Sequence, residues 1–179
     1  MQNLNREIAI RTVLERRYVL RLHGTVMGFG PFRALVSPWM SNETLNSYLN
    51  RRFATLTMTD RLLILRQISE GLKYLHDNCI VHGDLTSNNI LVATDGTACL
   101  ADSGISNIMV ESNPAFSYHA GAVCRAAPEL VIIPEGQIVQ CAIQSSDIYS
   151  LGCITLQVRL LFVLTQWDHL RLEYLKVKQ

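Results

Sequence analysis

The chain has 179 residues, a formal net charge of +1, 49% hydrophobic residues and 17% charged residues. This length is typical of one globular domain, and the near-neutral charge argues against a protein that wraps nucleic acid. Half of the residues are apolar and few are charged, so the composition excludes intrinsic disorder. The five cysteines form no CxxC pair, and we therefore expect neither a disulfide framework nor a zinc site.

The ends of the sequence predict no export or membrane signal. The first ten residues, MQNLNREIAI, lack the charged-then-apolar layout of a signal peptide. The apolar run that starts at Cys153 is interrupted by Gln157 and Arg159 and is too short to span a bilayer. We therefore expect an intracellular protein, in the cytoplasm, that binds neither membrane nor nucleic acid.

The first fifty residues predict a helix, two strands and a short helix. Residues 4–17 are rich in helix formers. Residues 19–25 and 32–39 carry β-branched and aromatic residues on either side of a glycine-rich turn, which is typical of two strands. Residues 44–50 predict one or two helical turns.

The most regular helical pattern covers residues 60–77. Thr59 is predicted to cap this helix, and Asp60 in the first turn complements its dipole. We expect the apolar face to pack against a second long helix over residues 146–164. The apolar residues recur every three or four positions and share that face: Leu62, Leu65, Ile68, Leu72 and Leu75.

A hairpin is predicted between these two helices. Residues 90–93 and 98–101 are short apolar runs that flank Asp95-Gly96. This dipeptide is typical of two-residue hairpin turns in which both positions have positive φ. A loop is predicted from 102 to about 127. The order of strands and helices predicts an α+β fold.

The densest polar signal is HGDLTSNN, followed after the hairpin by Asp102-Ser103-Gly104. Asp84 and Asn89 belong to a tight polar loop. The predicted hairpin returns the chain, so we expect Asp102 to lie beside them. Hard oxygen ligands suit Mg²⁺, and a carboxylate can orient a hydroxyl beside a triphosphate. Each of these residues alone is more often a turn former, but the ordered set favours a phosphate-handling site.

These motifs resemble those of eukaryotic protein kinases, and more specifically of the tyrosine-kinase-like branch. LVSPWM resembles the hinge, HGDLTSNN the catalytic loop HRDxxxxN, and DSG the metal-binding DFG. Ala127-Pro128-Glu129 matches APE, and DIYSLG from Asp147 matches DxWxxG. The five motifs stand in the family's order over about residues 3–155, and this order makes the resemblance specific.

The resemblance implies an ATP-dependent kinase domain that uses Mg²⁺ and acts on protein hydroxyls. Asp84 would orient the substrate hydroxyl, and Asn89 and Asp102 would hold Mg²⁺ on the phosphates. The family favours a serine/threonine kinase, although Thr86 leaves the acceptor type open.

The resemblance also implies an adenine site and several structural positions. The Pro38 carbonyl and the Met40 amide and carbonyl would bond the edge of the base, with Leu91 as the apolar floor. Ser37 would control the depth behind adenine. Further residues match structural positions of the family motifs: Glu7, the helix C glutamate, and His82, Gly104, Glu129 and Asp147.

The sequence departs from the family pattern at both ends and inside two motifs. The chain begins at the helix that carries Glu7, so the glycine-rich strands and the phosphate-binding lysine are missing ahead of it. GTVMGFGP is better explained as a turn than as the glycine-rich loop. Gly83 replaces the arginine of HRD and Ser103 the phenylalanine of DFG. After about residue 155 the resemblance fades.

We therefore expect a partial kinase domain over 1–155, with an N-lobe remnant and hinge at 1–40 and a C-lobe at 41–155. Residues 156–179 would form a divergent tail. Two functions stay open: phosphoryl transfer to protein Ser/Thr or Tyr hydroxyls, and an impaired pseudokinase or truncated module that binds partner proteins. The retained Asp/Asn/Asp set favours the first, whereas the missing lysine favours the second for this chain. The sequence indicates no oligomeric state.

Overall fold

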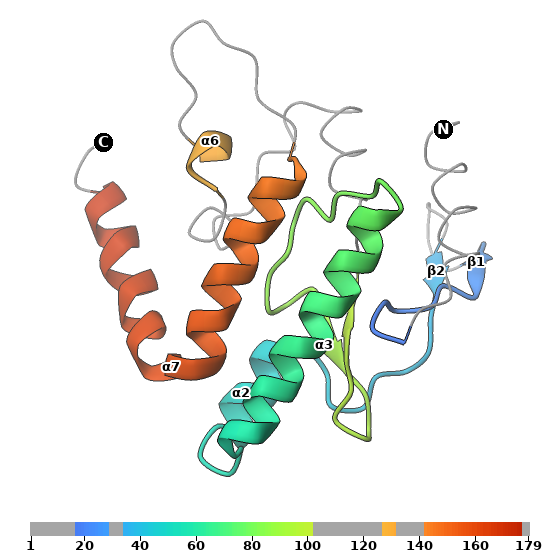
Figure 1. Ribbon diagram of the computed structural model, residues 1–179, viewed down its shortest axis with the longest axis horizontal. Coiled ribbons are helices and arrows are strands. Elements are labelled where there is room, and N and C mark those ends of the chain that lie inside the picture. The colour runs from blue at the N-terminus through green and yellow to red at the C-terminus, as the bar shows by residue number, and fades with distance from the viewer. Residues whose placement is uncertain (1–16, 29–33, 102–126, 132–141, 177–179) are drawn as a thin grey trace, which may run out of the picture.

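The computed structural model describes residues 17–28, 34–101, 127–131 and 142–176; for Val131 and residues 161–176 it describes only the backbone. Two small antiparallel sheets and four helices make up this part (Figure 1), so the α+β class is confirmed. The helix expected over 4–17 falls almost entirely outside the described residues. The elements are β1 (Gly24–Val26), β2 (Ala34–Val36), α2 (Leu45–Arg52), α3 (Met58–Asp77), β3 (Ile90–Val92), β4 (Ala98–Leu100), α6 (Pro128–Val131) and α7 (Gln144–Lys176).

Helix α3 begins at a capping box formed by Thr57 and Asp60. The Thr57 hydroxyl accepts a hydrogen bond from the Asp60 amide at 3.2 Å, and the Asp60 carboxylate accepts one from the Thr57 amide at 2.9 Å. The hydrogen bonds from Thr57 hold the pKa of Asp60 below its usual value. The prediction that Thr59 caps this helix is wrong, because only the Thr57–Asp60 spacing allows both bonds.

The buried face of α3 begins two residues later than the apolar spacing predicted. Leu62 is 53% exposed, so its assignment to the core face was wrong, and Leu65 is only partly buried. The buried stripe starts at Ile64 and recurs at 3.6-residue spacing, which leaves Leu62 on the opposite side. The buried residues of this face are Ile64, Gln67, Ile68, Gly71, Leu72 and Leu75.

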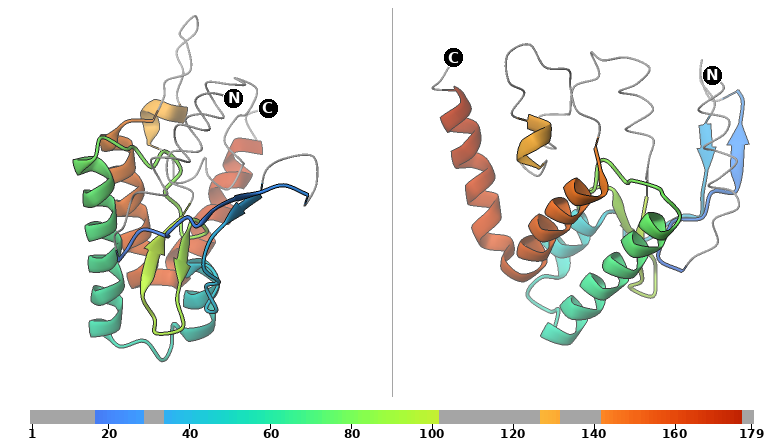
Figure 2. Two further views of the ribbon diagram at one scale, coloured as in Figure 1. Left: turned by 90° about the vertical axis from the view of Figure 1, so that its right-hand side faces the viewer. Right: turned by 45° about the horizontal axis from the view of Figure 1, so that its top comes forward.

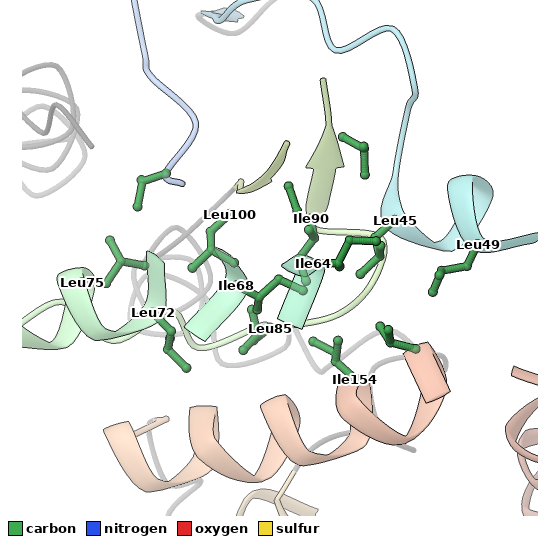
Figure 3. Close-up of a cluster of buried hydrophobic side chains, with 14 residues drawn as sticks. Leu45, Leu49, Ile64, Ile68, Leu72, Leu75, Leu85, Ile90, Leu100 and Ile154 are labelled. Carbon is green, nitrogen blue, oxygen red and sulfur yellow. The ribbon is translucent and has the colours of Figure 1, made fainter. Parts of the chain in front are cut away.

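One apolar cluster joins α2, α3, β3, β4 and α7 (Figure 3). Leu85, from the loop between α3 and β3, lies within this cluster and is 2% exposed. Because the cluster includes a residue of that polar loop, the core holds the loop between α3 and α7. Its fully buried side chains include Leu45, Leu49, Ile68, Leu75, Ile90, Val92, Ile154 and Val158.

Strands β3 and β4 form the expected hairpin, but with a different turn. Gly96 has a φ of 84°, whereas Asp95 is not among the residues with positive φ. The Gly96 amide donates to the Ala93 carbonyl at 3.0 Å, and the Asp95 carboxylate accepts from the Thr97 amide at 2.9 Å. The Asp95 side chain accepts a hydrogen bond from the backbone two residues later, which is typical of a turn that begins at aspartate. In this turn, Gly96 has positive φ and Asp95 does not. The expectation of two positive-φ positions was therefore wrong.

Strands β1 and β2 form a separate antiparallel pair, on the opposite side from α7 in Figure 1 and in the right view of Figure 2. Both strands are shorter than predicted. Val19, expected in the first of them, instead bridges to Leu100 of β4, and the Leu20 amide donates to the Leu100 carbonyl at 2.8 Å. Segment 17–22 therefore belongs with β4.

Helix α7 is longer than predicted and bends at Leu160, where φ is −135° and ψ is 42°. Figure 1 shows its two arms. Ile154 and Val158 on the first arm belong to the buried cluster with α3, so the predicted packing of the two long helices is confirmed. Among the described helices, none combines the length and apolar character needed to cross a membrane.

Candidate active site

Asp147, near the start of α7, holds the polar loop 82–89 in place. Its carboxylate accepts hydrogen bonds from the His82 amide at 2.8 Å and the Gly83 amide at 2.9 Å. His76 Nε2, from the last turn of α3, lies 2.8 Å from the same carboxylate. Asp147 is only 1% exposed, and a buried carboxylate needs such donors. These bonds tie the loop to both long helices.

Gly83 has a φ of 80°. This left-handed conformation costs a non-glycine residue about 1–2 kcal/mol. The loop conformation therefore favours glycine at the position where the family has arginine, and an arginine there would strain the bonds to Asp147.

The structure brings Asp84 and Asn89 together. Asn89 Nδ2 donates to the Asp84 main-chain carbonyl and to Asp84 Oδ2, each at 2.8 Å. Both residues are half-buried. Because the amide nitrogen makes both bonds, Oδ1 of Asn89 is the atom that could bind a cation.

The chain also returns beside Asn89 after β4. The Ala101 amide donates to the Asn89 carbonyl at 2.8 Å. The predicted metal ligand Asp102 follows Ala101 directly, but Asp102 and Gly104 lie outside the described residues, as does Glu7. Within the described part, no group of three His, Cys, Asp or Glu side chains could hold a metal ion.

The predicted hinge, residues 35–40, leads toward the strand that carries Leu91. Pro38 is exposed and Met40 is half-buried. The Met40 carbonyl accepts from the Glu43 amide at 3.0 Å, and the Asn42 amide donates to Val92 of β3 at 3.1 Å. Leu91 is half-buried between the fully buried Ile90 and Val92. Its side chain therefore faces away from the core, as strand alternation requires.

The remaining predicted positions are His82 and Glu129. His82 is fully buried, and its Nδ1 lies 3.4 Å from the Asp84 amide that donates to it. Glu129 is exposed on α6, and it joins none of the ion pairs found among the described residues. The structure places His82 in the loop, next to the Asp84–Asn89 pair.

Sequence reasoning missed two polar residues that support the loop and the strand behind it. Gln67 is 5% exposed, and its Oε1 accepts from the Ala98 amide of β4 at 2.9 Å. His76 bonds Asp147. One signal was present: both stand at core spacing on α3, three and four residues after Ile64 and Leu72, and a polar residue at such a position needs a buried partner.

Several known proteins are similar to this chain over most of its length. The family described as "Protein kinase domain" matches residues 1–171, past residue 155. Mouse mitogen-activated protein kinase kinase kinase 15 is 32% identical over 158 residues, which is 88% of this chain and 12% of that protein. Serine/threonine-protein kinase dst4 of Dictyostelium discoideum is 30% identical over 157 residues, 87% of this chain and 32% of that protein. An L-type lectin-domain containing receptor kinase of Arabidopsis thaliana is 32% identical over 88% of this chain and 24% of its own length. The chain thus spans less than two thirds of each relative.

Proposed function

We propose the following function because this chain belongs to the protein kinase domain family. The chain binds ATP with Mg²⁺ and positions a serine or threonine hydroxyl of a protein for phosphoryl transfer. Asp84 would orient the substrate hydroxyl, and Asn89 and Asp102 would hold Mg²⁺, which would supply positive charge beside the phosphates. Pro38, Met40 and Leu91 contact adenine.

The observation that carries this proposal is the Asp84–Asn89 pair. Asn89 Nδ2 donates one hydrogen bond of 2.8 Å to the Asp84 carboxylate and a second of 2.8 Å to the Asp84 main-chain carbonyl. Asp147 anchors the loop with its bonds to two amides. Phosphoryl transfer depends on positioned groups more than on covalent chemistry by the protein. A carboxylate held by the side-chain amide of Asn89 meets that need.

We expect weak ATP binding by these 179 residues. The lysines of the sequence are Lys73, Lys176 and Lys178, and none precedes the hinge. Lys73 pairs with Asp77 on the exposed face of α3 at 2.7 Å. A lost charge-assisted hydrogen bond costs about 1.5–3 kcal/mol, which is about tenfold to hundredfold in Kd. We therefore expect an affinity in the high micromolar range or weaker, with turnover near background.

Titration of a fluorescent ATP analogue with and without Mg²⁺ tests the proposal. Mg²⁺ should tighten binding by the unaltered chain, and Asn89→Ala and Asp102→Asn should remove most of that Mg²⁺ dependence. Asn88→Ala is the matched control, because Asn88 is exposed in the same loop. Binding that ignores Mg²⁺, or an equal loss in the Asn88 variant, would contradict the assignment.

A second candidate is a module that binds a partner protein without phosphoryl transfer. It is favoured by exposed apolar side chains at four- and eight-residue spacing on α7: Ile148, Leu156 and Leu160, each 49–55% exposed. Labelled ATP with dephosphorylated casein as acceptor separates the two candidates. Over a long incubation, slow transfer that disappears in Asp84→Asn supports the kinase, whereas equal incorporation by both chains supports the binding module.

A further inference from the structure

Arg61, near the start of α3, joins this helix to the bend of α7. Its Nη2 donates to the Phe53 carbonyl at 2.7 Å, and its Nη1 donates to the Arg159 carbonyl of α7 at 3.3 Å. The guanidinium carbon also lies 3.8 Å from the centre of the Phe53 ring. These contacts hold the planar guanidinium in one place. Figures 1 and 2 show the start of α3 and the bend of α7 at the same end of the molecule.

No carboxylate pairs with Arg61 or Arg159 in the part of the chain that the structure describes. Arg61 hydrogen bonds there to carbonyl oxygens, and the exposed side chain of Arg159 joins none of the ion pairs. Asp60, next to Arg61 in the sequence, uses its carboxylate to accept the Thr57 amide and hydroxyl. Residues 148–167 of α7 include no acidic residue. Two unpaired positive charges therefore lie on neighbouring helices.

Three large apolar side chains lie beside these arginines, and each is about half exposed. Positions i and i+4 of a helix share one side, so Met58 and Leu62 lie together on α3, with Arg61 next to them. Leu160 follows Arg159 at the bend of α7. Methionine and arginine are both enriched in protein interfaces. We call these five residues the α3–α7 surface: Met58, Arg61, Leu62, Arg159 and Leu160.

The core separates the α3–α7 surface from the Asp84–Asn89 pair. Leu85 of the polar loop packs in the apolar cluster with Ile64, on the buried side of α3. Leu62 lies on the opposite, exposed side of the same helix. A ligand on the α3–α7 surface would therefore leave the proposed ATP site accessible.

We propose that the α3–α7 surface docks an acidic, amphipathic segment of a partner protein. Carboxylates of the segment bind the two arginines, and its apolar side chains pack against the three apolar residues. Charge complementarity favours this partner, because the described part of the surface carries two positive charges that no carboxylate pairs with. The surface is small, so we expect a Kd of about 100 µM. Docking is independent of phosphoryl transfer.

Fluorescence anisotropy of labelled peptides tests the docking surface. A short peptide that repeats Glu-Glu-Leu-Leu should bind the 179-residue chain and saturate. Peptides that repeat Gln-Gln-Leu-Leu or Glu-Glu-Ser-Ser should each bind about tenfold more weakly, because docking needs both charge and apolar contact. Binding of the first peptide should weaken as the salt concentration rises.

Variants locate the binding on the chain. Arg159→Gln should weaken binding by about threefold, as expected for an exposed charge pair. Arg159→Glu should weaken it by about tenfold or more, because the new carboxylate repels the peptide. Leu62→Ser should weaken it by about threefold. Lys73→Gln is the matched control, since Lys73 also lies on α3 but is paired with Asp77, and the Kd should stay unchanged.

Four results would overturn the docking surface. They are an absence of saturable peptide binding, equal binding of the Gln-Gln-Leu-Leu peptide, an unchanged Kd in Arg159→Glu, and equal weakening in Lys73→Gln. Binding to phosphatidylserine vesicles in preference to the peptide would also overturn it, and would assign the surface to an anionic membrane. Asn89→Ala distinguishes this proposal from the proposed function, because it should remove the Mg²⁺ dependence of ATP binding and leave peptide binding intact.

Discussion

At Asp147, one buried carboxylate satisfies two backbone amides of the loop and a histidine of α3. Its partners His82 and Gly83 immediately precede Asp84, so the bonds at Asp147 set the path of the chain into the site. The same carboxylate joins α7 to α3 through His76. A substitution of Asp147 should therefore affect both the free energy of unfolding and the position of Asp84.

Asp147→Asn should lower the free energy of unfolding by about 2–4 kcal/mol, because hydrogen bonds to a charged group are lost and an amide NH₂ would face a donor. Urea unfolding measures this change. Asp77→Asn is the control, since Asp77 and Lys73 form an exposed pair with side chains 58% and 73% exposed. Its effect should stay within about 0.5 kcal/mol. Equal effects in the two variants would show that the buried bonds contribute little.

At the scale of elements, the start of α3 depends on one hydroxyl. Thr57 and Thr59 are both exposed threonines, but only Thr57 closes the capping box. Thr57→Ala should therefore cost about 1 kcal/mol of unfolding free energy, and Thr59→Ala less than about 0.5 kcal/mol. Thermal or urea unfolding of the pair checks this. A larger loss in the Thr59 variant would place the cap where the sequence predicted it.

The β1–β2 pair should be the least stable described element. Two short strands are marginal alone, and Val26, Leu35 and Val36 are 36–41% exposed. We expect fast amide hydrogen exchange over 24–26 and 34–36 and strong protection over 64–75 in α3. Measurement by mass spectrometry on the monomer decides this. Equal protection of the strands and the helix would contradict it.

At the scale of the whole molecule, α3 approaches β4 and segment 17–20 closely at Gly71. A Cβ there would lie 2.6 Å from the Tyr18 carbonyl oxygen and 3.2 Å from Leu100 Cγ. Gly71→Ala should destabilise the chain by about 1–3 kcal/mol, because the backbone must move. Gly152→Ala in α7, where a Cβ meets nothing within 4 Å, should stabilise by about 0.5–1 kcal/mol. Opposite signs in urea unfolding would support this packing; matching signs would contradict it.

The sequence by itself determined the features that depend on near neighbours. The five ordered motifs indicated the kinase family, and the family match bears this out. The regular apolar spacing predicted α3, and Asp95-Gly96 between two apolar runs predicted the hairpin. These features form from residues close in the chain, so local patterns suffice to predict them. The roles of all the candidate site residues, and the domain division at residue 155, stay predictions.

Only the tertiary structure decided which distant groups meet. Asp147 lies 64 and 65 residues from the amides that it binds, and Gln67 lies 31 residues from Ala98. Ile64 rather than Leu62 is buried because the elements packed against α3, which include β4 and α7, determine which side of the helix faces the core. Local sequence specifies an amphipathic helix or a turn, but contacts across long loops depend on how the whole chain packs. The sequence motifs therefore identify the candidate site, whereas the packing of the core determines where its residues lie.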